Sequence, residues 1–227
     1  MHLKLRHPRS SQDRSTCINI DRWVGKLLIL LTLMPVTSFA KDAVIAEATK
    51  ATVGQPAPDF KLVDTSGKLH TLKQYRGKVV VLEWFNPDCP FVKVAHREGK
   101  LGARGKALQA GGGVWLAINS GAVGMQGHGK ARNQQAKTTY GLTYPILLDE
   151  SGLVGKTYMA ERTPHIYVID PQGKLVYAGA LDSTGGAGYE KSEFTDYLKQ
   201  ALDAVAKQAP VPVSSTKAWG CSVKYQR

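Results

Sequence analysis

The feature that most constrains the fold is a run of β-branched and aromatic residues that ends abruptly in a turn. Residues 79–85 read VVVLEWF, and residues 86–88, Asn-Pro-Asp, follow directly. An almost unbroken apolar strand indicates a parallel or mixed sheet that is covered on both faces. Cys89 and Pro90 come next, and proline is favoured at the first position of a helix. The sequence therefore predicts a buried strand followed at once by a helix, with a cysteine at the junction.

The segments around this strand alternate between strand and helix patterns. Strands are predicted at 61–64, 69–72, 114–119, 144–149, 165–170 and 175–180, and helices at 90–108, 130–140, 152–159 and 189–209. This order is typical of an α/β protein with a central mixed sheet flanked by helices. It begins with a β-hairpin and ends in an extended C-terminal tail. No internal repeat or second domain is indicated.

The first forty residues have the pattern of a targeting segment. Six Lys and Arg lie in residues 1–26, residues 27–37 are apolar, and Ser-Phe-Ala ends at Ala40, as in a secretory signal peptide that is cleaved there. The apolar part is shorter than the roughly 18 residues that span a bilayer, so a permanent membrane anchor is the less favoured alternative. We expect a secreted or periplasmic protein.

Domain boundaries follow from that cleavage site and from shifts in composition. We expect a signal peptide at 1–40, a linker at 41–53, one domain at 54–209 and a C-terminal tail at 210–227.

Composition and charge exclude several classes of protein. Apolar residues make up 43% and charged residues 21% of the 227 residues, which argues against a disordered chain or a rod. The net charge is +12, and removal of the leader, with its six basic and two acidic residues, leaves +8. This positive charge is scattered and not interleaved with aromatic residues, so we expect a solvated basic surface and no nucleic-acid partner.

The mature chain retains two cysteines, Cys89 and Cys221. In an oxidising compartment they form a structural bridge, a redox pair or two independent thiols. Cys89 is expected where a strand becomes a helix, and the helix dipole and free amides there stabilise a thiolate. Lys93 and His96 follow on the same helix. We expect them to be ordinary surface residues, and the alternative is that they add positive charge beside Cys89.

Residues 83–92, EWFNPDCPFV, resemble the active-site strand and turn of the thioredoxin superfamily. Cys89 falls at the first cysteine of that family's Cys-x-x-Cys motif, and Val92 replaces the second. The resemblance implies a thioredoxin-like fold with Cys89 as the nucleophile. It also implies that Glu83 shuttles a proton. The alternative is that Glu83 has a purely structural role.

Thr163-Pro164, just before a predicted strand, resembles the cis-proline turn that faces the nucleophile in this superfamily. A cis X-Pro bond forms at low cost, and the backbone before it is able to pair with a substrate strand. The resemblance implies substrate contacts for Thr163, Pro164, Trp84 and Pro90.

Residues 54–60 and 72–78 resemble the peroxiredoxin-like or redoxin branch, which includes the alkyl hydroperoxide reductase and thiol-specific antioxidant relatives. The resemblance covers residues 53–209. The chain departs from the peroxidase pattern at Asn86, where that pattern has threonine.

The resemblance therefore favours an extracytoplasmic thiol-disulfide oxidoreductase with no cofactor and no metal. Its expected partners are protein thiols or disulfides and a reducing protein. One alternative is an antioxidant protein that reduces hydroperoxides. Another is a non-enzymatic module in which Cys89, with His96 or His165, binds copper or a partner thiol.

Cys221 is the candidate for the missing second thiol. Pro210 and Pro212 stop the last helix, and the extended tail beyond them is long enough to return to the active-site edge. The aromatic and apolar residues around Cys221 indicate that the tail docks. We expect Cys221 to resolve a mixed disulfide or sulfenic acid at Cys89. The alternatives are a permanent Cys89–Cys221 bridge and a thiol used for a partner or for dimerisation.

Overall fold

The computed structural model describes residues 49–98, 100–185 and 194–226, so the expected signal peptide lies outside the described residues. The strands are β1 (Lys61–Asp64), β2 (Leu69–Thr71), β3 (Val80–Trp84), β4 (Val114–Asn119), β5 (Ile146–Leu148), β6 (Arg162–Thr163), β7 (His165–Ile169), β8 (Leu175–Gly179) and β9 (Cys221–Ser222). The helices are η1 (Leu72–Tyr75, a 3-10 helix), α1 (Pro90–Arg97), α2 (Leu101–Ala110), α3 (Lys130–Thr139), α4 (Leu153–Thr157) and α5 (Tyr197–Ala206).

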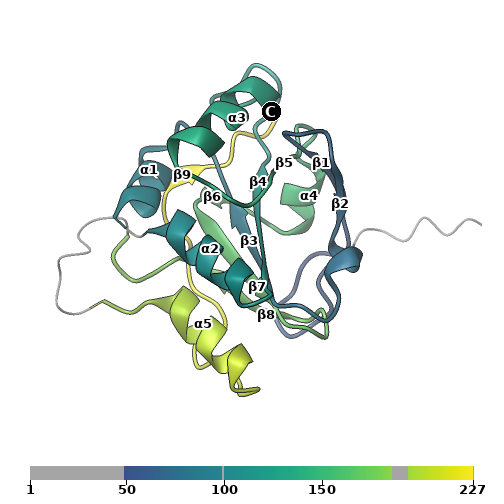
Figure 1. The fold of residues 1–227 in the computed structure, drawn as a ribbon, viewed down its shortest axis with the longest axis vertical. Coiled ribbons are helices and arrows are strands. Elements are labelled where there is room, and N and C mark those ends of the chain that lie inside the picture. Colours follow the sequence, from purple (N-terminus) through teal and green to yellow (C-terminus); the bar gives the residue numbers. More distant parts are fainter. Residues whose placement is uncertain (1–48, 99, 186–193, 227) are drawn as a thin grey trace, which may run out of the picture. The chain divides into compact units, whose positions relative to one another are not determined.

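Seven of the strands form one mixed sheet in the order β2-β1-β5-β4-β3-β7-β8 (Figure 1). β3 and β4 run parallel, as do β4 and β5, whereas β7 is antiparallel to β3. The hairpins β1–β2 and β7–β8 occur where the sequence predicts them. The predicted thioredoxin-like α/β fold, a mixed sheet flanked by helices, is confirmed.

Strand β3 is buried along its whole length because the sheet has a hydrophobic core on each face. Val81 packs in the core to which α1, α2, α3 and α5 contribute. Leu82 and Trp84 pack in the core on the other face, which α4 and the segment before β1 help to form. Two covered faces explain why this strand reads as a continuous apolar run.

The helix predicted at 90–108 is two helices. α1 ends at Arg97, and α2 begins at Leu101 after Lys100, whose φ of 53° is left-handed. Gly105 lies inside α2 and is needed for packing, because a Cβ there would overlap the Tyr144 ring. Gly105 thus allows α2 to pack closely against Tyr144.

The last helix is shorter than its predicted span of 189–209. It begins at Tyr197 because the Asp196 side chain accepts a hydrogen bond from the Lys199 amide at 2.9 Å and caps it. It ends at Ala206, three residues earlier than predicted. Residues 189–193 lie outside the described part of the chain.

The end of the expected linker packs against the domain. Ala51 is buried, and its amide donates to the Thr157 carbonyl at 2.9 Å. The Gly54 amide donates to the Leu175 carbonyl at 2.7 Å. Among the described residues, none of the helices is long and apolar enough to cross a membrane.

The C-terminal tail returns across the domain after α5. Ser215 forms a bridge with Ala178 beside the main sheet. Further along, β9 pairs antiparallel with β6, so that Thr163 lies opposite Cys221 (Figure 1, yellow strand beside β6). The predicted return of the tail to the active-site edge is therefore present in the structure.

Candidate functional site

The turn after β3 fixes the position of Cys89. The Asn86 side-chain oxygen accepts a hydrogen bond from the Asp88 amide at 2.9 Å, and the Cys89 amide donates to the Asn86 carbonyl at 3.1 Å. Asp88 forms an ion pair with Arg132 of α3 at 2.6 Å. Cys89 is thereby held as the N-cap residue of α1, with Pro90 as the first helical residue.

The Cys89 thiol is enclosed between the helix and the cis-proline turn. The side chain is 0% exposed, and its Sγ donates to the Thr163 carbonyl at 3.1 Å. The Thr163-Pro164 bond is cis, as predicted. Thr163 is buried, and its backbone is the part of this turn that meets the cysteine.

Cys221 lies directly against Cys89. The two thiols are in hydrogen-bonding contact, and both are free in this structure. Burial, together with the neighbouring Cys89, raises the pKa of the Cys221 thiol to about 11, although Lys224 and the Phe91 backbone act in the opposite direction. Cys221 is partly exposed, whereas Cys89 is fully buried. The fold thus joins two cysteines that are far apart in the sequence.

The tail is fixed on the side that precedes Cys221. The Thr216 hydroxyl accepts a hydrogen bond from the Ala180 amide at 2.9 Å, and the Trp219 indole donates to the Asp182 carbonyl at 3.0 Å. Gly220, with φ of +117°, lies so close to Thr163 that a Cβ there would overlap its carbonyl oxygen. This residue therefore needs to be glycine for the tail to approach β6.

The tail is also fixed on the side that follows Cys221. The Val223 amide donates to the Glu161 carbonyl at 3.0 Å, and the Tyr225 hydroxyl donates to the Ala160 carbonyl at 2.7 Å. The Tyr225 ring occupies space that a Cβ at Gly152 or Gly155 would fill. Anchors on both sides hold Cys221 beside Cys89.

Glu83 is fully buried on the same face of the sheet as the α1 core. Its carboxylate is 2.8 Å from His96 Nε2 and accepts hydrogen bonds from Trp115 Nε1 at 3.0 Å and from the Tyr144 hydroxyl at 3.4 Å. Burial, and then the charge of Glu83, raise the pKa of Tyr144. The expectation that His96 is an ordinary surface residue is wrong, because its side chain is only 2% exposed. Lys93 is exposed, as a surface residue would be.

Two of the expected substrate contacts differ in accessibility. Pro90 is exposed beside Cys89. Trp84 is 0% exposed, and its indole donates to the Ser120 hydroxyl at 3.0 Å. Since Trp84 packs in the core opposite Cys89, it does not reach the surface of the site in this structure.

The two histidines considered for copper binding have other partners. His96 faces Glu83, and His165 Nδ1 lies 3.2 Å from the Tyr167 hydroxyl. Burial lowers the pKa of His165 to about 4. In the part of the chain that the structure describes, no three potential metal-ligating side chains gather.

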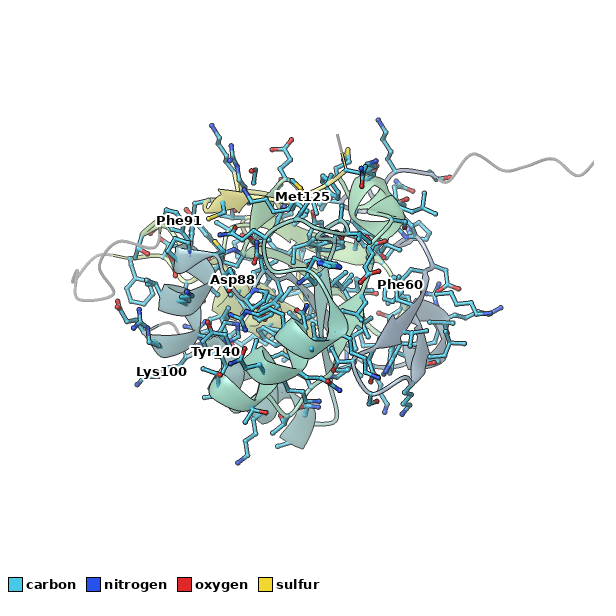
Figure 2. The ribbon with its side chains drawn as sticks, turned by 90° about the horizontal axis from the view of Figure 1, so that it is seen from above. Phe60, Asp88, Phe91, Lys100, Met125 and Tyr140 are labelled. Carbon is cyan, nitrogen blue, oxygen red and sulfur yellow. The ribbon has the colours of Figure 1, made fainter. Side chains whose placement is uncertain are left out.

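Side chains near Cys89 are accessible in part. Asp88, Phe91 and Tyr140 lie on one side of the molecule, away from Phe60 (Figure 2). Phe91 is 37% exposed, and its ring centroid is 6.1 Å from that of Trp219. The surface next to the buried Cys89 is therefore partly aromatic.

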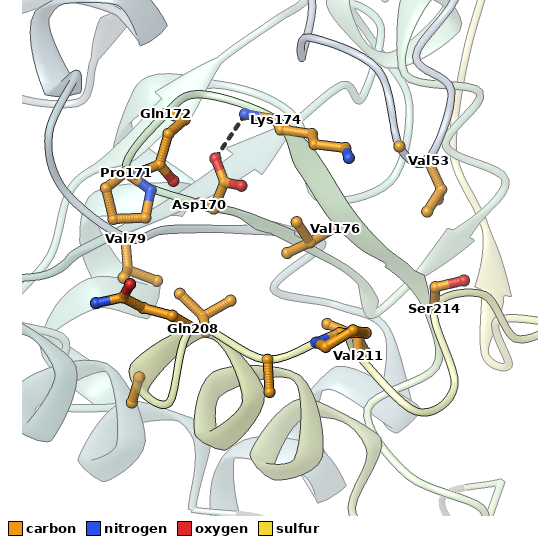
Figure 3. Close-up of a pocket in the computed structure, with 15 residues that line it drawn as sticks. Val53, Val79, Asp170, Pro171, Gln172, Lys174, Val176, Gln208, Val211 and Ser214 are labelled. Atoms are coloured by element: carbon orange, nitrogen blue, oxygen red, sulfur yellow. Dashed lines mark hydrogen bonds between the residues drawn. The ribbon is translucent and has the colours of Figure 1, made fainter.

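A cavity of about 890 Å³ lies elsewhere, between the β7–β8 turn and the end of α5 (Figure 3). Its walls include Val79, Val176 and Val211, with Gln172 and Gln208 among the polar residues. Neither cysteine nor the cis-proline turn lines it.

The sequence did not predict three features of the site: two side-chain pairs and the glycine next to Cys221. The Asp88–Arg132 pair and the Glu83–His96 pair join residues from different elements, and the sequence pattern carries no signal for either pairing. The glycine next to Cys221 was a usable signal, since a glycine beside a docking thiol often marks a close backbone approach.

Comparison with known proteins gives results consistent with this geometry. The thiol-disulfide oxidoreductase ResA of Geobacillus thermodenitrificans is 33% identical over 150 residues, which cover 66% of this chain and 80% of that protein. ResA of Bacillus subtilis is 28% identical and covers 67% of this chain and 79% of its own. A hypothetical protein from Sinorhizobium meliloti has a similar structure, with a TM-score of 0.70, 28% identity and coverage of 78% of this chain and 97% of its own. The AhpC/TSA family model matches residues 53–178. The chain belongs to the AhpC/TSA family.

Proposed function

We propose that this protein is a thiol-disulfide oxidoreductase whose redox centre is the pair Cys89 and Cys221. The observation that carries the proposal is the contact between the two thiols at the β6 edge. Val92 lies where a Cys-x-x-Cys motif has its second cysteine, and Cys221 supplies a thiol from the tail instead. The names of the ResA relatives support the same reaction class.

The reaction is an exchange of two electrons and two protons between this pair and a partner. When the pair is oxidised, Cys89 and Cys221 lose their protons and form a disulfide, while a partner disulfide becomes two thiols. The reverse reaction reduces the pair. Cys89 is the proposed nucleophile within the centre, where its target is the sulfur of Cys221, because thiolates are stabilised at a helix N-terminus.

Glu83 is proposed to take part as a proton acceptor within the core. It belongs to the same hydrophobic core region as α1, and its pairing with His96 gives a buried acid and base at 2.8 Å. Such a pair is able to hold a proton without exposing charge to water. Its structural role, as acceptor for Trp115 and Tyr144, operates at the same time.

The Thr163-Pro164 turn and Pro90 surround Cys89. Substrate contact is proposed for Pro90 and for the turn together with β9, which already pairs with Thr163. The proposed partners are protein thiols or disulfides and a reducing protein, outside the cytoplasm. The leader at 1–40 and the small number of cysteines support this location.

Peroxide reduction has less support as the function. The position where the peroxidase pattern has threonine is held by Asn86, which is buried. The Asn86 side-chain oxygen already accepts the Asp88 amide. A peroxide at this position would find a turn-forming amide in place of a hydroxyl group.

The decisive experiment is to oxidise the protein and map its disulfides by non-reducing mass spectrometry, with turnover of a model disulfide measured in parallel. We expect a reducible Cys89–Cys221 linkage, and loss of turnover in both Cys89→Ser and Cys221→Ser. A potential well above about −300 mV would distinguish this pair from a permanent structural bridge. Full turnover in Cys221→Ser would contradict the proposal.

A further inference from the structure

The two cysteines of the centre differ in accessibility. Cys89 is 0% exposed and its thiol points to the Thr163 carbonyl. Cys221 is partly exposed. Attack on a sulfur requires access along the axis of the bond that breaks, so the two atoms are not equivalent to an incoming thiol.

The backbone edge at the cis-proline turn is already occupied. β9 pairs with β6, which places Cys221 opposite Thr163 and Ser222 opposite Arg162. A partner strand cannot form the same backbone pairing with β6 while β9 is in place.

Displacement of β9 would break contacts on both of its sides. The Trp219 hydrogen bond to Asp182 would be lost on one side. The Val223 hydrogen bond to Glu161 and the Tyr225 hydrogen bond to Ala160 would be lost on the other. The tail is thus built as part of the site, and a partner meets it first.

We propose that the partner exchanges disulfides through Cys221, and that Cys89 is the internal thiol that never bonds to the partner. This inference rests on the proposed function. It reverses the order expected from the sequence, in which the mixed disulfide forms at Cys89 and Cys221 resolves it.

A protein dithiol reduces the oxidised centre in two successive exchange steps. A partner thiolate attacks Cys221 Sγ, a new sulfur–sulfur bond forms there, and the Cys89–Cys221 bond breaks with its electron pair passing to Cys89. The second partner thiolate then attacks the partner's own sulfur in the mixed disulfide. Cys221 leaves and takes up a proton, the partner is oxidised to a disulfide, and the centre holds two reduced cysteines.

Each cysteine suits its place in this order. Cys89 leaves as a thiolate at the N-terminal end of α1, where the helix dipole stabilises negative charge. The negative charge of neighbouring Asp88 is offset by its ion pair with Arg132. Lys224 acts on Cys221 as a nearby positive charge, and therefore attracts an incoming thiolate to this sulfur.

The test uses the full chain in its oxidised form and reduced glutathione as the probe. Peptide mapping before the reaction establishes the Cys89–Cys221 linkage and separates it from Cys17. The protein is then mixed with glutathione, quenched in acid after short times, and mapped for glutathione adducts. We expect at least about ten times more adduct on Cys221 than on Cys89.

A variant that releases the tail tests whether access selects the sulfur. In Tyr225→Ala the tail loses one of its two anchors beyond Cys221, the hydrogen bond to Ala160, and the share of adduct on Cys89 should rise severalfold. Val213→Ala is the matched control, because Val213 is an exposed tail residue and its loss should leave the distribution unchanged.

Adducts mainly on Cys89, or equal amounts on both sulfurs, in the wild-type protein would overturn the inference. A Tyr225→Ala distribution identical to that of the wild type would overturn the role given to the tail. Failure of the proposed function looks different, because the Cys89–Cys221 linkage would then be missing from the map made before glutathione is added.

Discussion

The two ends of strand β3 differ, because one leads to the two cysteines and the other borders a cavity. Beyond Trp84 the chain forms the Cys89 turn, and the C-terminal tail closes over it. Before Val80, at Val79, the protein opens into the cavity of about 890 Å³. The larger hollow has walls of valine and amide side chains, whereas the closed end has two thiols in contact.

This difference shows that side-chain chemistry and position in the sheet, rather than cavity volume, identify the functional site. Cys89 follows the carboxyl end of β3, where open α/β sheets place their sites. A site for exchange between sulfurs needs two sulfur atoms within reach of each other, and it does not need a large cavity. Three predictions test how strongly the two ends differ.

The largest effect is expected from removal of the buried carboxylate near the closed end. Glu83→Leu leaves the buried Trp115 and Tyr144 donors without their acceptor and the buried His96 ring without its partner. We expect the free energy of unfolding to fall by about 3–5 kcal/mol, because several buried polar groups lose their partner at once. Urea denaturation at neutral pH with reduced thiols measures this change.

The matched control for that substitution is Gln172→Ala in the wall of the cavity, which should change the free energy of unfolding by less than about 0.5 kcal/mol. If Glu83→Leu were as stable as the control, the Glu83 network would not be a stabilising feature of the closed end.

The next effect concerns acid stability and His165, which pairs with Trp84 across β7 and β3. Burial lowers its pKa from 6.5 to about 4, so the unfolded chain binds the proton more readily than the folded protein. The stability that depends on neutral His165 is complete above pH 6.5 and is lost as the pH falls through about 4. The difference corresponds to about 3 kcal/mol.

His165→Gln should therefore lose less stability than the wild type between pH 6.5 and 4, as measured by urea denaturation at several pH values. His128→Gln is the control, because the His128 side chain is 30% exposed. Parallel pH profiles for the wild type and His165→Gln would contradict this assignment of the acid sensitivity.

The smallest effect on overall stability is expected at the glycine that lets the tail approach β6. Gly220→Ala combines a positive φ with overlap of the Thr163 carbonyl oxygen, and the backbone strain alone costs about 1–3 kcal/mol of tail docking. We expect the rate of Cys89–Cys221 linkage formation to fall by about tenfold or more, measured by timed oxidation and acid quenching.

Gly112→Ala is the control for that variant. Gly112 has φ of +83° but open space around its Cα, and it lies just before β4. It should lower stability to a similar degree and leave linkage formation unchanged. Equal rates in the two alanine variants would show that docking does not depend on Gly220.

The sequence was sufficient for most of the fold and for one half of the site. The run before Cys89 determines β3, and proline after it determines where α1 begins, because both signals are local. The docking of Cys221 was predictable from the apolar and aromatic residues on the tail that follows Pro210 and Pro212. Contacts between side chains of different elements were not predictable. His96 was expected at the surface, because its partner Glu83 comes from a strand beneath its helix.

The position of Cys221 also links redox state to folding. Cys89 and Cys221 are separated by about 130 residues, so a bond between them would close most of the domain into a single covalent ring. In the chain-entropy model a ring of that size stabilises the folded state by about 4–5 kcal/mol. The oxidised protein would then melt at a distinctly higher temperature than the reduced one. Each turnover would form and break the Cys89–Cys221 bond, and so would raise and lower the stability of the whole fold.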